Sequence, residues 1–213
     1  MSERASAQNA VEVADWRLRT FELYAEVRTR YEQDPQAAHS FWIAERNRLF
    51  AEHPASALSA AAKSSFTGLN IASYDPAYRF QASPTAERRG ETYRVQTGTD
   101  GVVEFECLGT LDLPTLGSLA LWRHQGYGGG IFLPFRDSGA GKAGGSYGGG
   151  RYLLDSIKGS LLGYTEEEEP RLVIDFNFAY NPSCAYDESW ACPLPGPANR
   201  LSVEVPVGEL TAL

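Results

Sequence analysis

The segment Glu91–Leu108, ETYRVQTGTDGVVEFECL, decides the fold class because it contains two strand-like runs and the turn that joins them. Aromatic and β-branched residues, which favour strands, stand on both sides of Thr97-Gly98-Thr99-Asp100-Gly101, a sequence typical of a hairpin turn. So short a connection leaves no room for the helix that usually joins parallel strands. The segment therefore predicts two antiparallel neighbours.

Short runs of the same kind continue along the chain after residue 66. The expected strands are Tyr78–Ala82, Glu91–Thr97, Val102–Leu108, Leu116–His124, Ile131–Phe135, Arg171–Phe176 and Leu201–Val207. Most of them are separated by less than a helix length, which disfavours alternating strands and helices. Residues 66–213 are therefore expected to form an antiparallel β-barrel or a two-sheet sandwich.

The N-terminal part has a helical pattern instead. Between residues 11 and 31 apolar side chains recur mostly three and four positions apart. Asp34-Pro35 interrupts this run, and a second helix is expected over residues 36–52.

The two patterns together predict the domain organisation. We expect a disordered N-terminus over residues 1–8 and one domain over residues 9–213. This domain would be mainly β (α+β), with a helical hairpin over residues 9–54 and a barrel-like body over residues 66–213.

Composition and charge restrict the class of protein. Hydrophobic residues make up 43% and charged residues 22% of the 213 residues, as in ordinary globular proteins. The net charge of -8 repels phosphate backbones, so nucleic acid is not an expected partner. No apolar run approaches the roughly 18 residues that span a bilayer. The first residues are polar where a signal peptide is apolar, so we expect a cytoplasmic protein that does not enter a membrane.

The glycine-rich segment Ser138–Gly150, SGAGKAGGSYGGG, contains three short motifs without the context that their chemistry needs. A G-x-G-x-x-G match is followed by more glycines instead of the helix that holds a pyrophosphate. Gly141-Lys142 lacks the other residues of a P-loop. Ser146 lies in G-x-S-x-G, but every histidine precedes it, contrary to the order in α/β-hydrolases. We expect a loop whose glycines allow close backbone approach.

The three cysteines are too few for a disulfide framework. Cys107 lies in a strand-like run, where a buried hydrophobic role is expected. Cys184 and Cys192 are separated by seven residues, more than in a typical zinc site, and no histidine is near them in the sequence. We expect no metal site, and the sequence leaves open whether Cys184 and Cys192 pair.

Polar and aromatic residues gather in Asp175–Asn199, which we expect to be the functional centre. Asp175 and Asn177 would share one face of an apolar strand and line a polar cavity. The loop that follows is long, aromatic and irregular, as functional loops often are. Arg151 offers a planar fork for an anion, although a structural carboxylate such as Asp175 explains it equally well.

We therefore expect a small polar or anionic molecule to bind at one end of the body. The expected ligand-binding residues are Arg151, Tyr152, Asp175, Asn177, Tyr180, Asn181, Cys184, Tyr186, Trp190 and His53. Alternatively, His53 could serve only to form hydrogen bonds at the end of its helix. The sequence identifies no catalytic residue and no cofactor.

Three other functions remain open at this point. A hydrolase would use Asp175 or His53 as its base and Cys184 as its nucleophile, and would need Cys184 close to one of them. A flavin-binding or redox barrel is compatible with the arginine and the aromatic residues. A structural or interaction protein would use the loop as a clamp and have no pocket.

Several longer motifs carry a family resemblance. They are F-A-E-H-P at Phe50–Pro54, F-T-G-L at Phe66–Leu69, Y-D-P at Tyr74–Pro76, Y-G-G-G-R-Y-L at Tyr147–Leu153, and D-F-N-F-A-Y-N-P-S-C-A-Y with W-A-C-P-L-P within Asp175–Pro195. In these residues the chain resembles the bacterial and archaeal family known as domain of unknown function 1684, over roughly Trp16–Glu209. That family usually has an acidic residue where Ala198 stands and threonine where Ser146 stands. The resemblance locates a site and implies no reaction.

Overall fold

The computed structural model describes residues 3–97, 101–190 and 192–211. Of the N-terminal residues 1–8, for which disorder is expected, residues 3–8 belong to the first helix and residues 1–2 lie outside the described residues. The centre of the predicted hairpin turn, residues 98–100, lies outside them as well.

The helical hairpin consists of α1 (Glu3–Tyr31) and α2 (Pro35–Glu52), as predicted, although α1 begins earlier than expected. The Asp34 carboxylate caps α2, because it accepts hydrogen bonds from the backbone N–H groups of Gln36 and Ala37. Pro35 suits the first turn of α2, where no backbone partner is lost. In the described part of the chain, no helix is long and apolar enough to cross a membrane.

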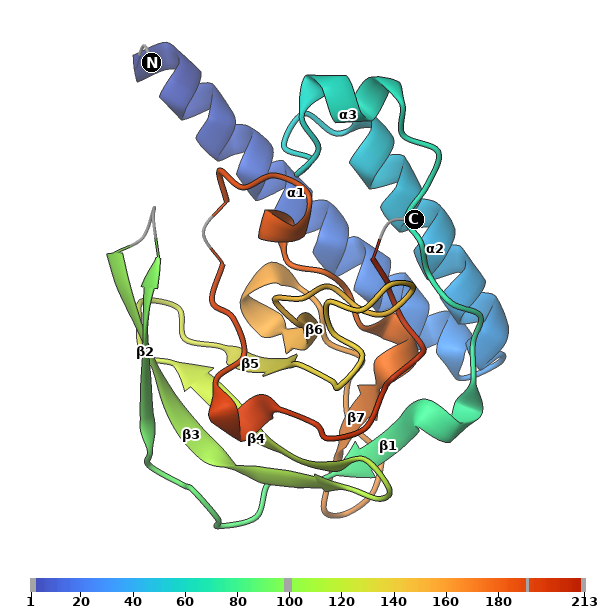
Figure 1. Ribbon diagram of the computed structural model, residues 1–213, viewed down its shortest axis with the longest axis vertical. Coiled ribbons are helices and arrows are strands. Elements are labelled where there is room, and N and C mark those ends of the chain that lie inside the picture. Colours follow the sequence, from blue (N-terminus) through green and yellow to red (C-terminus); the bar gives the residue numbers. More distant parts are fainter. Residues whose placement is uncertain (1–2, 98–100, 191, 212–213) are drawn as a thin grey trace.

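The strands form two antiparallel sheets. The larger sheet has the order β2-β3-β4-β5-β6, and the smaller one pairs β1 with β7 (Figure 1). The strands are β1 (Arg79–Ala82), β2 (Thr92–Thr97), β3 (Gly101–Leu113), β4 (Gly117–His124), β5 (Ile131–Phe135), β6 (Arg151–Asp155) and β7 (Leu172–Asp175). The short helices are α3 (Ala60–Ser64), η1 (Pro76–Tyr78), η2 (Ser156–Lys158), η3 (Phe176–Phe178), η4 (Ser183–Ala185) and η5 (Pro197–Asn199). Each strand of the larger sheet neighbours the next one in sequence, so this sheet is a meander.

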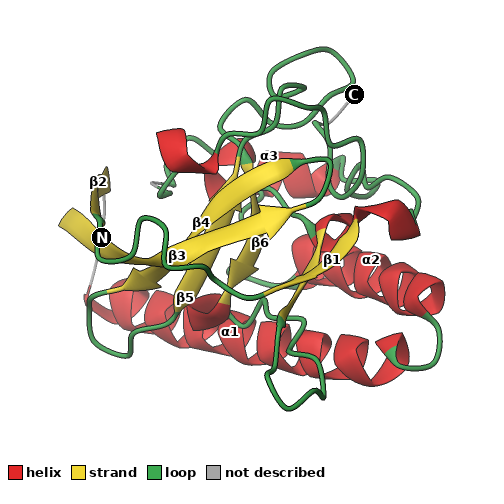
Figure 2. Ribbon diagram, turned by 90° about the horizontal axis from the view of Figure 1, so that it is seen from below, coloured by secondary structure: helices red, strands yellow, loops and turns green. Residues whose placement is uncertain are grey.

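The predicted α+β, mainly β class with a helical hairpin is confirmed, and of the two arrangements offered the two-sheet one is observed. The barrel is wrong, because β2 and β6 lie at opposite edges of the larger sheet and do not pair in the described residues. The long helices lie along one side of the molecule, and the strands of the larger sheet lie next to them (Figure 2).

Two segments differ from the predicted strands. Leu201–Val207 is irregular: Leu201 and Val203 bond the backbone of Arg136 and Ser138, but the carbonyls of Val205 and Val207 accept hydrogen bonds from the buried Arg151 instead of from a strand. Strand β6 was not predicted, since all five of its residues are buried and its sequence, RYLLD, has no alternation of polar and apolar side chains.

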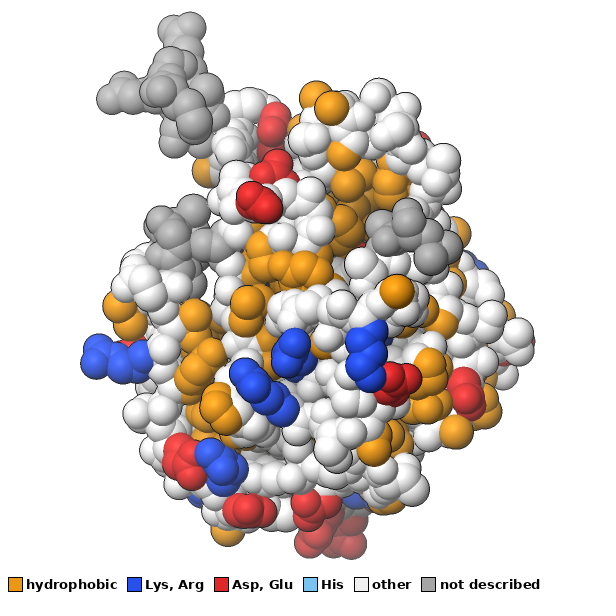
Figure 3. Space-filling view, viewed as in Figure 1, with side chains coloured by type: hydrophobic (Ala, Val, Ile, Leu, Met, Phe, Trp, Pro, Cys, Tyr) orange, Lys and Arg blue, Asp and Glu red, His pale blue; other side chains and the backbone are white. Residues whose placement is uncertain are grey.

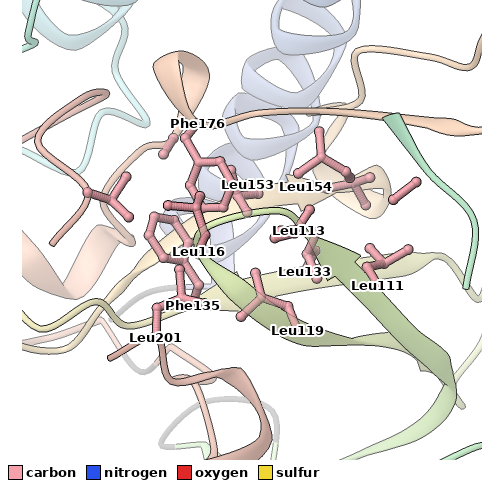
Figure 4. Packing of buried hydrophobic residues seen from close by; sticks show 14 of the residues in the cluster. Leu111, Leu113, Leu116, Leu119, Leu133, Phe135, Leu153, Leu154, Phe176 and Leu201 are labelled. Carbon is pink, nitrogen blue, oxygen red and sulfur yellow. The ribbon is translucent and has the colours of Figure 1, made fainter. Parts of the chain in front are cut away.

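The main core lies between the two sheets. Leu111, Leu119 and Leu133 of the larger sheet pack with Ile174 of β7 and with Phe176, which follows it (Figure 4). A second cluster joins the hairpin to the body through Trp42 and Phe178, whose ring centroids lie 5.3 Å apart. The body therefore holds α2 against the segment that follows β7.

The C-terminal segment crosses the molecule from beside β4 of the larger sheet toward α2 (red in Figure 1). Gly208 makes this crossing close, because it has a φ of 75° and a Cβ there would lie 2.6 Å from the Phe176 carbonyl oxygen. The same holds for Gly150, where a Cβ would lie 2.6 Å from the Phe135 carbonyl oxygen. These contacts bring Glu209 next to α2.

Candidate functional site

Arg151 is fully buried and all its observed hydrogen bonds go to the protein itself. Its Nη2 atom donates to Asp137 Oδ2 and to the Val205 carbonyl, both at 2.8 Å, and Nη1 donates to the carbonyls of Val207 and Glu209. Burial lowers the pKa of Arg151, against the opposing effect of the Asp137 carboxylate. These contacts match the alternative in which Arg151 pairs with a structural carboxylate, but the carboxylate is that of Asp137 and not that of Asp175.

Ser146 belongs to the same cluster. It is buried, and its hydroxyl donates to Asp137 Oδ2 at 2.7 Å. The hydroxyl of the G-x-S-x-G motif therefore bonds the carboxylate that also holds Arg151.

Asp175 and Asn177 form a clamp between the hairpin and the body. Asp175 Oδ1 accepts hydrogen bonds from the Asn177 backbone N–H at 3.0 Å and from Asn177 Nδ2 at 2.8 Å. Asp175 Oδ2 accepts one from the Tyr31 hydroxyl of α1 at 2.8 Å, and Asn177 exchanges two with the backbone of Asp75. Burial raises the pKa of Asp175, although the bonds from Asn177 and Tyr31 oppose this. The predicted shared strand face is wrong, because β7 ends at Asp175 and Asn177 lies in η3.

His53 joins the end of α2 to α1. Its Nδ1 atom accepts from the Ala55 backbone N–H at 3.1 Å, so Nε2 carries the proton and donates to Asp15 Oδ2 at 3.0 Å. This is the helix-end role that was the alternative for His53. Cys184 contacts Cys192 and Tyr147 instead of His53 or Asp175, so the described residues do not form the catalytic arrangement that the hydrolase alternative requires.

Tyr180, Asn181 and Tyr186 meet two residues that the sequence analysis did not select, Arg46 and Glu209. Arg46 Nη2 lies 2.8 Å from Glu209 Oε2, and the Asn181 backbone N–H donates to the same oxygen at 3.1 Å. The Tyr186 hydroxyl donates to the other oxygen, Glu209 Oε1. We call these five residues the Arg46–Glu209 centre.

Aromatic rings surround the guanidinium group of Arg46. It lies 4.9 Å from the ring centroid of Trp42, 5.1 Å from that of Tyr180 and 5.3 Å from that of Phe50. Burial alone would lower the pKa of Arg46, but the Glu209 carboxylate raises it overall, so the guanidinium stays charged. Burial and Glu209 also raise the pKa of Tyr186, which keeps its hydroxyl a donor.

Two buried polar atoms of this centre have no hydrogen-bond partner among the described residues. They are Arg46 Nε, a donor, and Asn181 Oδ1, an acceptor, on residues that are 9% and 7% exposed. Nearly all buried polar atoms in folded proteins are bonded to protein or water, so each of these two atoms has hydrogen-bonding capacity for a further group. Both atoms belong to residues that bond the same carboxylate oxygen of Glu209.

The sequence contains a signal that could have identified Arg46. Trp42, Arg46 and Phe50 are spaced four residues apart and therefore lie on one face of α2. An arginine between two aromatic residues on a buried helix face predicts a buried positive charge that needs a partner of opposite charge. Glu209 has no comparable signal, because its place depends on the crossing of the C-terminal segment.

Cys184 and Trp190 lie on the segment that leads to Pro193, and Tyr152 links this segment to the centre, because its ring centroid lies 5.8 Å from that of Tyr180. The Tyr152 hydroxyl donates to the Pro193 carbonyl at 2.7 Å, and Trp190 is 39% exposed. Cys184 donates its backbone N–H to Cys192 Sγ at 3.4 Å. The predicted residues therefore belong to separate sets of contacts rather than to one pocket.

Among the cavities of the described surface, two lie elsewhere. One, of about 300 Å³, lies between α1 and α2 and is lined by residues that include Arg19, Glu26 and Glu45. The other, of about 150 Å³, lies at the glycine-rich segment beside Lys142 and Glu204. Neither is lined by a predicted site residue. Apolar side chains instead lie along the seam between α2 and the body on the face shown in Figure 3.

Known protein families and solved structures include relatives of this chain. The family described as "Protein of unknown function (DUF1684)" matches residues 64–210. The solution NMR structure of an uncharacterised protein from Haloarcula marismortui is similar, with 32% sequence identity and a TM-score of 0.57. The match covers 85% of this chain and 94% of that one. Among curated proteins, none matches the chain. The chain belongs to the DUF1684 family of proteins of unknown function.

Proposed function

We propose that the protein binds a small polar molecule at the Arg46–Glu209 centre. The observation that carries this proposal is the pair of unpartnered atoms, Arg46 Nε and Asn181 Oδ1. A neutral molecule that offers one acceptor and one donor, such as an amide, would satisfy both. Leaving such groups unpaired costs about 1–3 kcal/mol each, which a matching ligand would recover.

The charge of the centre favours a polar molecule over an anion. Glu209 already neutralises Arg46 at 2.8 Å, and burying a further negative charge beside Glu209 would be costly. Of the two kinds of ligand expected from the sequence, the neutral polar one therefore fits better. The rings of Trp42, Phe50 and Tyr180 around the guanidinium would provide apolar contact to its carbon atoms.

Access would be beside Tyr186. Tyr186 is half-buried, as is Tyr180, and the chain becomes exposed from Glu188 to Trp190 shortly after Tyr186. Its contacts to Glu209 and to the ring of Phe50, 4.8 Å away, would have to open for a ligand to enter. Binding would therefore involve movement of the segment after Asn181.

The test uses glycolamide as a neutral probe and glycolate as its anionic counterpart. We expect glycolamide to raise the thermal unfolding midpoint of the wild type in a saturable way, and glycolate to do so less. Arg46→Lys keeps the charge opposite Glu209 but removes the Nε–H, so it should lose the response. Arg48→Lys is the matched control, since Arg48 lies on the same helix, is exposed and pairs with Glu45.

Equal responses of all three proteins, or a non-saturable response at high probe concentration, would contradict the proposal. The absence of any response to both probes, together with a single water bonded to Arg46 Nε and Asn181 Oδ1 in a high-resolution structure, would overturn it in favour of a structural role.

A further inference from the structure

The second feature without an assigned role is the contact between Cys184 and Cys192. Cys184 belongs to η4, and its backbone N–H donates to Cys192 Sγ at 3.4 Å. The two side chains also interact, since each is the main cause of the shift in the pKa of the other. Both cysteines are half-buried and reduced, so small reagents have access to them.

Two tyrosines from other elements fix this arrangement. The Tyr147 hydroxyl, from the glycine-rich segment, lies 3.4 Å from the Cys184 carbonyl oxygen and 3.9 Å from its Sγ atom. The Tyr152 hydroxyl, from β6, holds the Pro193 carbonyl directly after Cys192 at 2.7 Å. Plain packing of a small hydrophobic residue needs no such supports. Cys107 shows the contrast, since it is fully buried in the sheet and its thiol bonds only the Gly109 carbonyl.

The surroundings favour the thiolate form of Cys192. The hydrogen bond from the Cys184 thiol lowers the pKa of Cys192 to about 6, with further help from the backbone of Cys184 and the charge of Lys158. The same contact raises the pKa of Cys184, which therefore stays a thiol. The titratable groups around the pair are Tyr147, Tyr152, Lys158 with its partner Asp155, and Glu188.

We propose that Cys184 and Cys192 are a dithiol site that reacts with low-molecular-weight disulfides and closes reversibly into an internal disulfide. Cys192 Sγ already lies 3.4 Å from the backbone nitrogen of Cys184, so the two sulfur atoms need only a local approach to reach the roughly 2.05 Å of an S–S bond. The hydrogen bonds on Cys192 identify it as the attacking sulfur and Cys184 as the resolving one.

The reaction balances in two exchange steps. The Cys192 thiolate attacks one sulfur of the small disulfide RSSR, forming a mixed disulfide and releasing RS⁻. Cys184 then loses its proton to the released thiolate and attacks Cys192 Sγ, forming the internal bond and releasing the second RS⁻, which takes a proton from water. Two thiols of the protein are oxidised, and RSSR is reduced to two RSH. An excess of RSH reverses both steps.

The test equilibrates the reduced full-length chain with mixtures of oxidised and reduced glutathione, then blocks free thiols with N-ethylmaleimide. We expect Cys184 and Cys192 to lose labelling together, and peptide mapping to find them linked. Cys184→Ser should stop at the first step and accumulate a glutathione adduct on Cys192. Cys192→Ser should lose the fast reaction, and Cys107→Ser, as the control, should behave as the wild type.

A readout on the wild type alone keeps the proposal testable if a variant fails to fold. The labelling rate of Cys192 should reach half its maximum near the pKa of about 6, against roughly 8.5 for an ordinary thiol. Separate adducts on both cysteines without a link, or a midpoint near the ordinary value, would overturn the proposal. Neither result depends on whether the Arg46–Glu209 centre binds a ligand.

Discussion

Two buried arginines, Arg151 and Arg46, show how differently the same side chain is used in this protein. Arg151 is 0% exposed and donates to Asp137 and to three backbone carbonyls. Arg46 is 9% exposed, pairs with Glu209, and is otherwise surrounded by aromatic rings. Many hydrogen bonds to fixed carbonyls indicate a structural role, whereas sparse hydrogen bonding among rings leaves capacity for a partner.

The two arginines also meet at one residue. Arg151 Nη1 donates to the backbone carbonyl of Glu209 at 3.2 Å, and Arg46 binds the side chain of the same glutamate. Arg151 therefore holds the backbone of residues 205–209 in the position that places the Glu209 side chain next to Arg46. Among the described residues, the Nε atom of each of these two arginines has no hydrogen-bond partner. What distinguishes the Arg46–Glu209 centre is that it also contains an acceptor without a partner, Asn181 Oδ1.

The largest expected effect is on stability, from Arg151→Lys. Lysine cannot reproduce the planar fork, so bonds to the carbonyls of Val205, Val207 and Glu209 would be lost. We expect the free energy of unfolding to fall by about 3 kcal/mol, at roughly 1 kcal/mol for each bond. Urea unfolding measures this. A loss below about 1 kcal/mol would mean that Arg151 is not the support described here.

The same change at Arg46 should cost less and separate the two roles. Arg46→Lys keeps the ion pair with Glu209 and loses part of the contact with the rings, so we expect a loss of about 1 kcal/mol in urea unfolding. A cost as large as that of Arg151→Lys would erase the distinction between the two sites.

The smallest expected effect concerns the seam between α2 and the body. Burial lowers the pKa of His39, whose Nε2 atom bonds the Asn177 carbonyl at 2.9 Å. Below pH 6.5 the unfolded chain takes up a proton that the folded protein resists, so stability is present above that pH and is lost as the pH falls toward the lowered pKa. His39→Gln keeps the donor without the titration.

Unfolding experiments between pH 5 and 7.5 compare the two proteins. We expect the wild type to lose more stability than His39→Gln as the pH falls. Parallel curves would show that this seam, on the helix that also carries Arg46, is not tightly closed around His39.

The local patterns of the chain predicted much of the fold. The spacing of apolar residues in residues 11–52 located the helical hairpin, and the turn after Thr97 located β2 and β3. The strand predicted over Leu201–Val207 was wrong in its second half. Alternation of side chains does not reveal that the carbonyls of Val205 and Val207 accept hydrogen bonds from an arginine more than 50 residues away in sequence. Closure into a barrel likewise depends on the two edges of the sheet, which no local pattern describes.

The candidate site was predicted only in part, for a similar reason. Tyr180, Asn181 and Tyr186 were selected from an aromatic and polar loop, and they do converge. Their partners Arg46 and Glu209 lie 163 positions apart in sequence, so their meeting follows from the path of the C-terminal segment. Asp175 and Asn177 were selected as polar residues in an apolar run, but an internal clamp gives the same pattern.

The most direct test of the distinction between the two arginines is a high-resolution crystal structure of the protein soaked with glycolamide. We expect the probe next to Tyr186, with its carbonyl oxygen accepting a hydrogen bond from Arg46 Nε and a donor group bonding Asn181 Oδ1. Glycolamide bound at Arg151, or a water molecule joining Arg46 Nε to Asn181 Oδ1 with no probe present, would contradict it.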